Sequence, residues 1–217
     1  MFLKIARWVP ANGIVFAVLV VVATLLTIDH PGMKTDSGEI VSYYADSGNR
    51  SKELVALFLI GLAGLCFLSF LGSFRGVLAR AEGEPARLTT AVTASGAAFI
   101  ALALAAHGAG TTMALASDIA ENFSVDPNTA KVTWALSALL FGLSLFAAAA
   151  MALSTTVLAL QTRALPAWLA WTGALATVAG IFTIVWPPLS AIVLLWIAAL
   201  SAWMLRPAPT AIPVAAT

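Results

Sequence analysis

Six stretches of the chain are long and apolar enough to cross a lipid bilayer as helices. They lie at about residues 9–28, 54–74, 90–112, 134–158, 168–186 and 189–205. A spanning helix needs about 20 mainly apolar residues, because the hydrocarbon core is about 30 Å thick and each residue rises about 1.5 Å. The pattern predicts an all-α fold, a polytopic transmembrane bundle of six helices that forms one domain over residues 1–206. Residues 207–217 are expected to form a disordered cytoplasmic tail.

The composition argues against an ordinary soluble domain. Hydrophobic residues make up 61% of the chain and charged residues 10%, against about 45–50% and about 25% in soluble proteins. A soluble helical bundle would carry charges along its outer helix faces, and the six stretches have no Asp, Glu, Lys or Arg. The lipid bilayer is therefore the expected partner. The net charge of +1 gives no reason to expect nucleic acid, and no cofactor is expected.

Two adjacent prolines, Pro187 and Pro188, separate the last two apolar stretches. Proline removes a backbone donor and disfavours helix at the residue before it. One kinked helix across both stretches would be about twice as long as the bilayer is thick. The sequence therefore predicts a tight helical hairpin.

The distribution of charge between the connecting segments predicts the orientation. One side carries seven basic residues and two acidic ones, and the other carries four basic and eight acidic: Lys4, Arg7, Arg75, Arg80, Arg87, Arg163 and Arg206 with Glu82 and Glu84, against Lys34, Arg50, Lys52 and Lys131 with Asp29, Asp36, Glu39, Asp46, Glu53, Asp118, Glu121 and Asp126. Cytoplasmic loops are rich in Lys and Arg. Both termini are therefore expected in the cytoplasm.

The first outer segment contains the pattern of a short amphipathic helix. Asp36 and Glu39 have the spacing of a capping box, and Ile40, Tyr43 and Tyr44 follow at helical neighbour spacing. Tyrosine is common at the level of the lipid headgroups, so we expect this helix to lie on the outer membrane surface. The alternative is a lid or a docking surface in which Tyr43 and Tyr44 bind a ligand.

The two histidines are the candidates for outward-facing chemistry. His30 follows the first apolar stretch, and His107 lies near the outer end of the third, among small residues. An ionisable group at membrane depth suggests function. One hypothesis is a metal site formed by His30, His107 and Asp118, and another is a ligand site that includes His107. The alternative is a neutral, packed His107, since no HExxH spacing or other ligand pattern occurs. We expect no catalytic residue.

Three segments resemble known sequences. They are Glu39-Ile-Val-Ser-Tyr-Tyr-Ala-Asp46, Phe70-Leu-Gly-Ser-Phe-Arg75 and Ala164-Leu-Pro-Ala-Trp-Leu-Ala-Trp171. Together they resemble a broad group of uncharacterised actinobacterial multi-pass membrane proteins, and the similarity covers most of the chain. The resemblance implies a six-helix fold in a bacterial plasma membrane. It implies no reaction.

Three functions are compatible with these features. The first is a non-enzymatic accessory or scaffold subunit that binds other membrane-protein subunits, because helix-packing surface is abundant and recognisable catalytic motifs are absent from the sequence. The second is a small-molecule or lipid transporter or binding bundle, with the Tyr43 and Tyr44 helix as its lid. The third is an outward-facing metal-dependent hydrolase that uses His30, His107 and Asp118.

Overall fold

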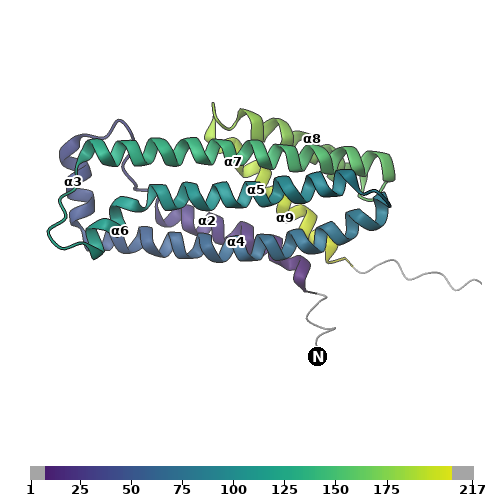
Figure 1. Ribbon diagram of the computed structural model, residues 1–217, viewed down its shortest axis with the longest axis horizontal. Coiled ribbons are helices and arrows are strands. Elements are labelled where there is room, and N and C mark those ends of the chain that lie inside the picture. The colour runs from purple at the N-terminus through teal and green to yellow at the C-terminus, as the bar shows by residue number, and fades with distance from the viewer. Residues whose placement is uncertain (1–7, 207–217) are drawn as a thin grey trace, which may run out of the picture.

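The computed structural model describes residues 8–206, and every regular element in that part of the chain is a helix (Figure 1). The elements are η1 Val9–Ala11, α2 Asn12–Leu26, α3 Ser37–Ala45, α4 Ser47–Glu82, α5 Arg87–Gly110, α6 Thr112–Ile119, α7 Pro127–Thr162, α8 Ala167–Phe182, η2 Pro187–Leu189 and α9 Ser190–Met204. The predicted tail at 207–217, and Lys4 and Arg7, lie outside the described residues.

The longer helices form a ring in which each packs against two others. Going round the ring, α4 packs on α5, α5 on α7, α7 on α8, α8 on α9, α9 on α2, and α2 on α4. Apolar side chains fill its centre. The rings of Phe16, Phe67 and Phe99 meet with centroids 5.0 to 6.2 Å apart, and Met151 of α7 and Trp196 of α9 are also buried in this core.

Five helical segments are long and apolar enough to cross a membrane: Val9–Leu26, Ser47–Glu82, Arg87–Gly110, Pro127–Thr162 and Pro187–Met204. The sixth expected span corresponds to α8, which has 16 residues and is shorter than these. The chain is therefore a helical, multi-pass membrane protein. The double proline does separate two helices, because α8 ends at Phe182 and α9 begins at Ser190 after the short η2 turn.

Two helices are much longer than the apolar stretches that predicted them. Both α4 and α7 have 36 residues, which corresponds to about 54 Å. They begin earlier than expected because an aspartate caps each one. Asp46 accepts a hydrogen bond from the Gly48 amide, and Asp126 accepts from the amides of Asn128 and Thr129. N-capping of this kind satisfies amides that have no partner within the helix.

The third expected span ends close to its predicted limit. Helix α5 ends at Gly110, and α6 begins at Thr112. At its other end α5 is capped by Glu82, whose carboxylate accepts from the amides of Leu88 and Thr89 at 2.8 Å. After α5 the chain turns, and α6 runs across the end of the bundle toward the start of α4, against which it packs (Figure 1).

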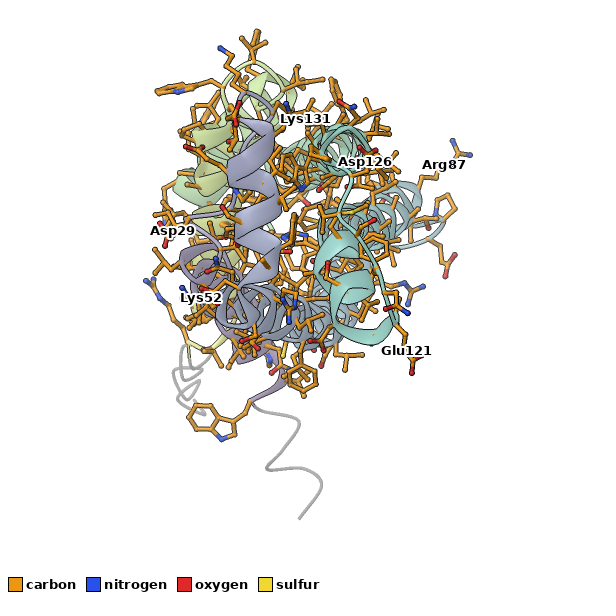
Figure 2. All side chains as sticks on the ribbon, turned by 90° about the vertical axis from the view of Figure 1, so that its left-hand side faces the viewer. Asp29, Lys52, Arg87, Glu121, Asp126 and Lys131 are labelled. Atoms are coloured by element: carbon orange, nitrogen blue, oxygen red, sulfur yellow. The ribbon has the colours of Figure 1, made fainter. Side chains whose placement is uncertain are left out.

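The long helices project beyond α2, α8 and α9 at one end of the bundle, where α3 and α6 cover them (Figure 1). We call this end the headpiece: residues 27–36, α3, α6, the segment 120–126 and the first two turns of α4 and α7. Charged side chains, among them Asp29, Lys52, Glu121, Asp126 and Lys131, surround it (Figure 2). The expected helix in the first outer segment is present as α3.

Candidate functional site

The headpiece has a small core of its own, separate from the main core of the bundle. It consists of Ile40, Tyr44, Met113, Ala114, Ala130 and Trp134, contributed by α3, α6 and α7. Ile40 and Tyr44 are four residues apart and so share one face of α3. That face packs against α6 and α7, and Trp134 donates a hydrogen bond from Nε1 to the Tyr44 hydroxyl at 3.2 Å.

The Tyr44 ring is not half-exposed at the protein surface, as the expected interfacial position requires. Its side chain is 1% exposed, because the apolar face of α3 meets other helices of the protein rather than lipid. Tyr43 points partly outward and is half-buried. The capping box is also only half formed. The Asp36 carboxylate accepts from the Gly38 amide, and no return hydrogen bond from Glu39 occurs among the described residues.

A carboxylate and an imidazole form a close pair beneath α3. His30 Nδ1 lies 2.8 Å from Glu53 Oε1, and Glu53 is 2% exposed. The His30 ring meets the rings of Trp134 and Tyr43 edge to face, with centroids 5.0 and 5.8 Å apart. His30 therefore links the 27–36 segment to α3, α4 and α7 at once.

The second oxygen of this carboxylate has no hydrogen-bond partner. Glu53 Oε2 is buried and unpaired, although buried polar atoms are nearly always hydrogen-bonded. The charge affects its neighbours. Burial, and then the negative charge of Glu53, raise the pKa of the Tyr43 hydroxyl and of the Tyr44 hydroxyl above the ordinary tyrosine range. The site is thus electronegative and shielded from water.

Arg50 fixes the end of α3 next to this pair. Its Nη1 donates to the carbonyl oxygens of Tyr44 at 2.7 Å and Ala45 at 3.0 Å. A cation at the C-terminus of a helix is favourable, because the last carbonyls carry partial negative charge. Arg50 Nε also lies 3.7 Å from Asp118 Oδ1, which connects α4 to α6.

The structure does not bring the predicted metal ligands together. His30 is paired with Glu53, Asp118 lies beside Arg50, and His107 Nδ1 is hydrogen-bonded to the Ala103 carbonyl oxygen at 2.9 Å. Within residues 8–206, no three His, Cys, Asp or Glu side chains are placed to share a metal ion.

The predicted ligand-binding residues are only partly together. Tyr43 and Tyr44 are adjacent in the headpiece, with ring centroids 5.2 Å apart. His107 instead lies on α5, half-buried, with the Phe141 ring 6.5 Å away. This geometry agrees with the packed alternative for His107.

Sequence reasoning missed Glu53, Arg50 and Trp134 as members of the site. Glu53 and Arg50 counted only as loop charges, and Trp134 only as the start of an apolar stretch. One signal was available: Glu53 directly precedes the apolar run that starts at Leu54, so a helix extended by one turn would bury it.

Comparisons with known proteins give no further assignment. No protein-family model, no curated protein and no solved structure matches the chain.

An open apolar groove lies outside the headpiece, between α8, the proline turn and α9. It has a volume of about 420 Å³ and is lined by side chains such as Leu175, Phe182, Val185, Trp186 and Ile192. This lining offers no polar group to a ligand.

Proposed function

We propose that this chain is a non-enzymatic accessory or scaffold subunit of a bacterial plasma-membrane assembly. In this proposal six helices cross the bilayer, both termini are cytoplasmic, and the headpiece stands on the outer surface. The observation that carries it is the filled helix ring. Phe16, Phe67 and Phe99 meet at its centre, which favours a structural role over a transport path.

Polar side chains within the ring support the same reading. Thr155, Thr177 and Thr183 are buried and donate to carbonyl oxygens of their own helix at 2.7 to 3.0 Å. Hydroxyls satisfied in this way do not line a polar route. Transporters and pumps usually carry ionisable residues at membrane depth. The expected spans have no Asp, Glu, Lys or Arg, and the histidine among them, His107, is hydrogen-bonded to the Ala103 carbonyl of its own helix.

Three features support α8 as a sixth span. It occupies a place in the ring between α7 and α9. Buried polar bonds tie it to both: Thr156 of α7 donates to the Ala170 carbonyl at 3.2 Å, and Trp196 of α9 donates to the Leu169 carbonyl at 3.4 Å. Exposed Trp168 and Trp186 lie at its start and just beyond its end, and tryptophan favours both membrane interfaces.

The test is purification of the tagged full chain from its native membrane in mild detergent, followed by mass spectrometry and native gel analysis. The proposal predicts a discrete complex that contains the chain and other membrane proteins in fixed ratio. Recovery of the isolated chain alone, under conditions in which other membrane complexes stay intact, would contradict it.

A lipid-binding role is the second candidate, and the apolar groove between α8 and α9 favours it. Helix partners in membranes prefer small residues at their contact, whereas the groove is lined mostly by large ones. An acyl chain suits such a surface better than a helix does. Native mass spectrometry would show retained lipid, and Val178→Trp, which fills the groove from an exposed position of its lining, would release it.

A further inference from the structure

The unpaired Glu53 oxygen is an unusual feature of the headpiece. The Glu53 side chain is 3% exposed, its Oε1 is paired with His30, its Oε2 has no hydrogen-bond partner, and the Tyr43 hydroxyl lies close enough for the two groups to interact. An ionised carboxylate is costly to bury unless a cation or several donors compensate for it. A positive charge next to Glu53 would therefore lower the cost of burying its carboxylate.

Aromatic rings surround the same point. His30 lies against Trp134 and Tyr43, and Tyr43 in turn meets Tyr44 edge to face. The faces of tryptophan and tyrosine rings attract cations, and aromatic cages of this type recognise organic ammonium groups. A buried carboxylate paired with an imidazole that itself packs against two such rings has the chemistry of an ammonium site.

The geometry points to a binding site for a small organic ammonium ion in the headpiece, formed by Glu53, Tyr43 and Trp134. In the structure the His30 side chain occupies this site. The incoming cation replaces His30 beside Glu53, and His30 moves outward with the 27–36 segment. The site would exist whether or not the protein serves as an accessory subunit.

An organic cation fits this site better than a metal ion. Glu53 is the carboxylate paired with His30, and within residues 8–206 no three His, Cys, Asp or Glu side chains are placed to share a metal ion, whereas protein sites for metal ions usually offer three or more ligands. The imidazole that would be displaced is itself a flat organic ring, so the space it leaves is lined by aromatic carbon as well as by one carboxylate.

The guanidinium of Arg50 is directed at other acceptors. Its Nη1 donates to the carbonyl oxygens of Tyr44 and Ala45 at the end of α3, and its Nε, which has no hydrogen-bond partner, lies 3.7 Å from Asp118 Oδ1. His30, the side chain that now occupies the site, belongs to a short connecting segment and not to a helix. The backbone bonds of residues 27–36 are local, such as His30 N to the Thr27 carbonyl and Thr35 N to the Gly32 carbonyl.

The test is calorimetric titration of the full chain in lipid nanodiscs with choline chloride. Because His30 competes for the site, His30→Ala should bind choline at least tenfold more tightly than the wild type does. Glu53→Gln, alone or combined with His30→Ala, should weaken binding at least tenfold. Glu39→Gln is the matched control, because Glu39 is an exposed acid on α3 and its loss should leave binding unchanged.

A neutral isostere of choline, 3,3-dimethylbutan-1-ol, separates charge recognition from simple filling of a hole, and it should not bind. Equal choline affinity in the wild type and His30→Ala, binding that survives Glu53→Gln, or equal binding of the isostere would each overturn the proposal.

If His30→Ala does not fold, the wild type alone decides the question. Excess choline should then speed amide hydrogen exchange in residues 27–36 as His30 leaves the site, and unchanged exchange would overturn the proposal.

Discussion

His30 Nδ1 and Glu53 Oε1 lie 2.8 Å apart although 23 residues separate them in the chain. The contact joins a short connecting segment to the second turn of α4, beneath α3 and beside Trp134. It is the one place in the described part of the chain where a histidine and a carboxylate form a pair. The headpiece is organised around it.

Loss of one member of this pair should destabilise the protein. Removing one partner of a buried ion pair costs about 3–5 kcal/mol, and the partial exposure of His30 places His30→Ala near the lower limit. Thermal unfolding followed by circular dichroism should show a clearly lower Tm. Glu39→Gln should leave Tm unchanged. His30→Leu combined with Glu53→Leu should recover most of the loss, because no buried charge is left without a partner. A wild-type Tm for His30→Ala would refute the assigned role of the pair.

The two tyrosines give a direct optical test of the headpiece. The chain contains only two tyrosines, and burial followed by the charge of Glu53 raises the pKa of both. Phenolate absorbance of the native protein should therefore appear only well above pH 10, whereas the unfolded chain should titrate at about 10. Glu53→Gln should move the Tyr43 titration back toward about 10. Titration of both native tyrosines at the ordinary value would contradict their burial.

The same pKa shift has a consequence for stability. A folded-state pKa above the unfolded value means that the neutral phenols stabilise the fold at every pH below about 10. This contribution is lost as the pH rises from about 10 through the higher folded-state pKa. The free energy of unfolding should therefore decline in strongly alkaline solution, and it should decline less steeply in Tyr43→Phe.

Because α7 and α8 pack closely at Gly180, we expect this position not to tolerate a larger side chain. A Cβ added at Gly180 would lie 2.9 Å from the Leu145 carbonyl oxygen, whereas one at Gly61 would meet nothing within 4 Å. Overpacking of this kind costs about 1–3 kcal/mol. Gly180→Ala should lower the denaturant midpoint, and Gly61→Ala should leave it equal or higher. Equal midpoints for the two variants would be evidence against the α7–α8 contact.

The stability of the start of α7 should depend on the protonation of Asp126. Hydrogen bonds from the Thr129 hydroxyl and amide hold the pKa of the Asp126 carboxyl below its usual range. Its stabilising effect is therefore present above the ordinary value of about 3.9 and is lost as the pH falls through the lower folded-state pKa. Thr129→Val should raise this pKa, measured by carboxyl NMR, while Thr133→Val should not, because its hydroxyl bonds to Ala130.

The sequence predicted the helices well because hydropathy reports directly on burial in lipid. It also located α3, since Asp36 caps it and Ile40 and Tyr44 share a face. It did not predict that α4 and α7 continue past the apolar stretches, because Arg50, Lys52 and Glu53 resemble a solvated loop when only polarity is considered. A charged helical turn outside the membrane has the same composition.

The candidate site was the least predictable part of the chain. The pairing of His30 with Glu53, and the placement of both beside Trp134, depends on how α3 folds back over the ends of α4 and α7. No spacing along the chain encodes that arrangement. His107 attracted attention because it stands alone at membrane depth, yet its Nδ1 is satisfied by its own helix.

The central claim, a six-span bundle with its headpiece outside, is tested most directly by cysteine labelling. Cys66 is the only cysteine, so Cys66→Ser gives a clean background for Lys34→Cys, Gln161→Cys and Val185→Cys. A membrane-impermeant maleimide applied to intact cells should label Lys34→Cys in the headpiece and Val185→Cys after α8, and should reach Gln161→Cys only after permeabilisation. Labelling of Gln161→Cys and Val185→Cys from the same side would show that α8 does not cross, and protection of Lys34→Cys in intact cells would place the headpiece inside.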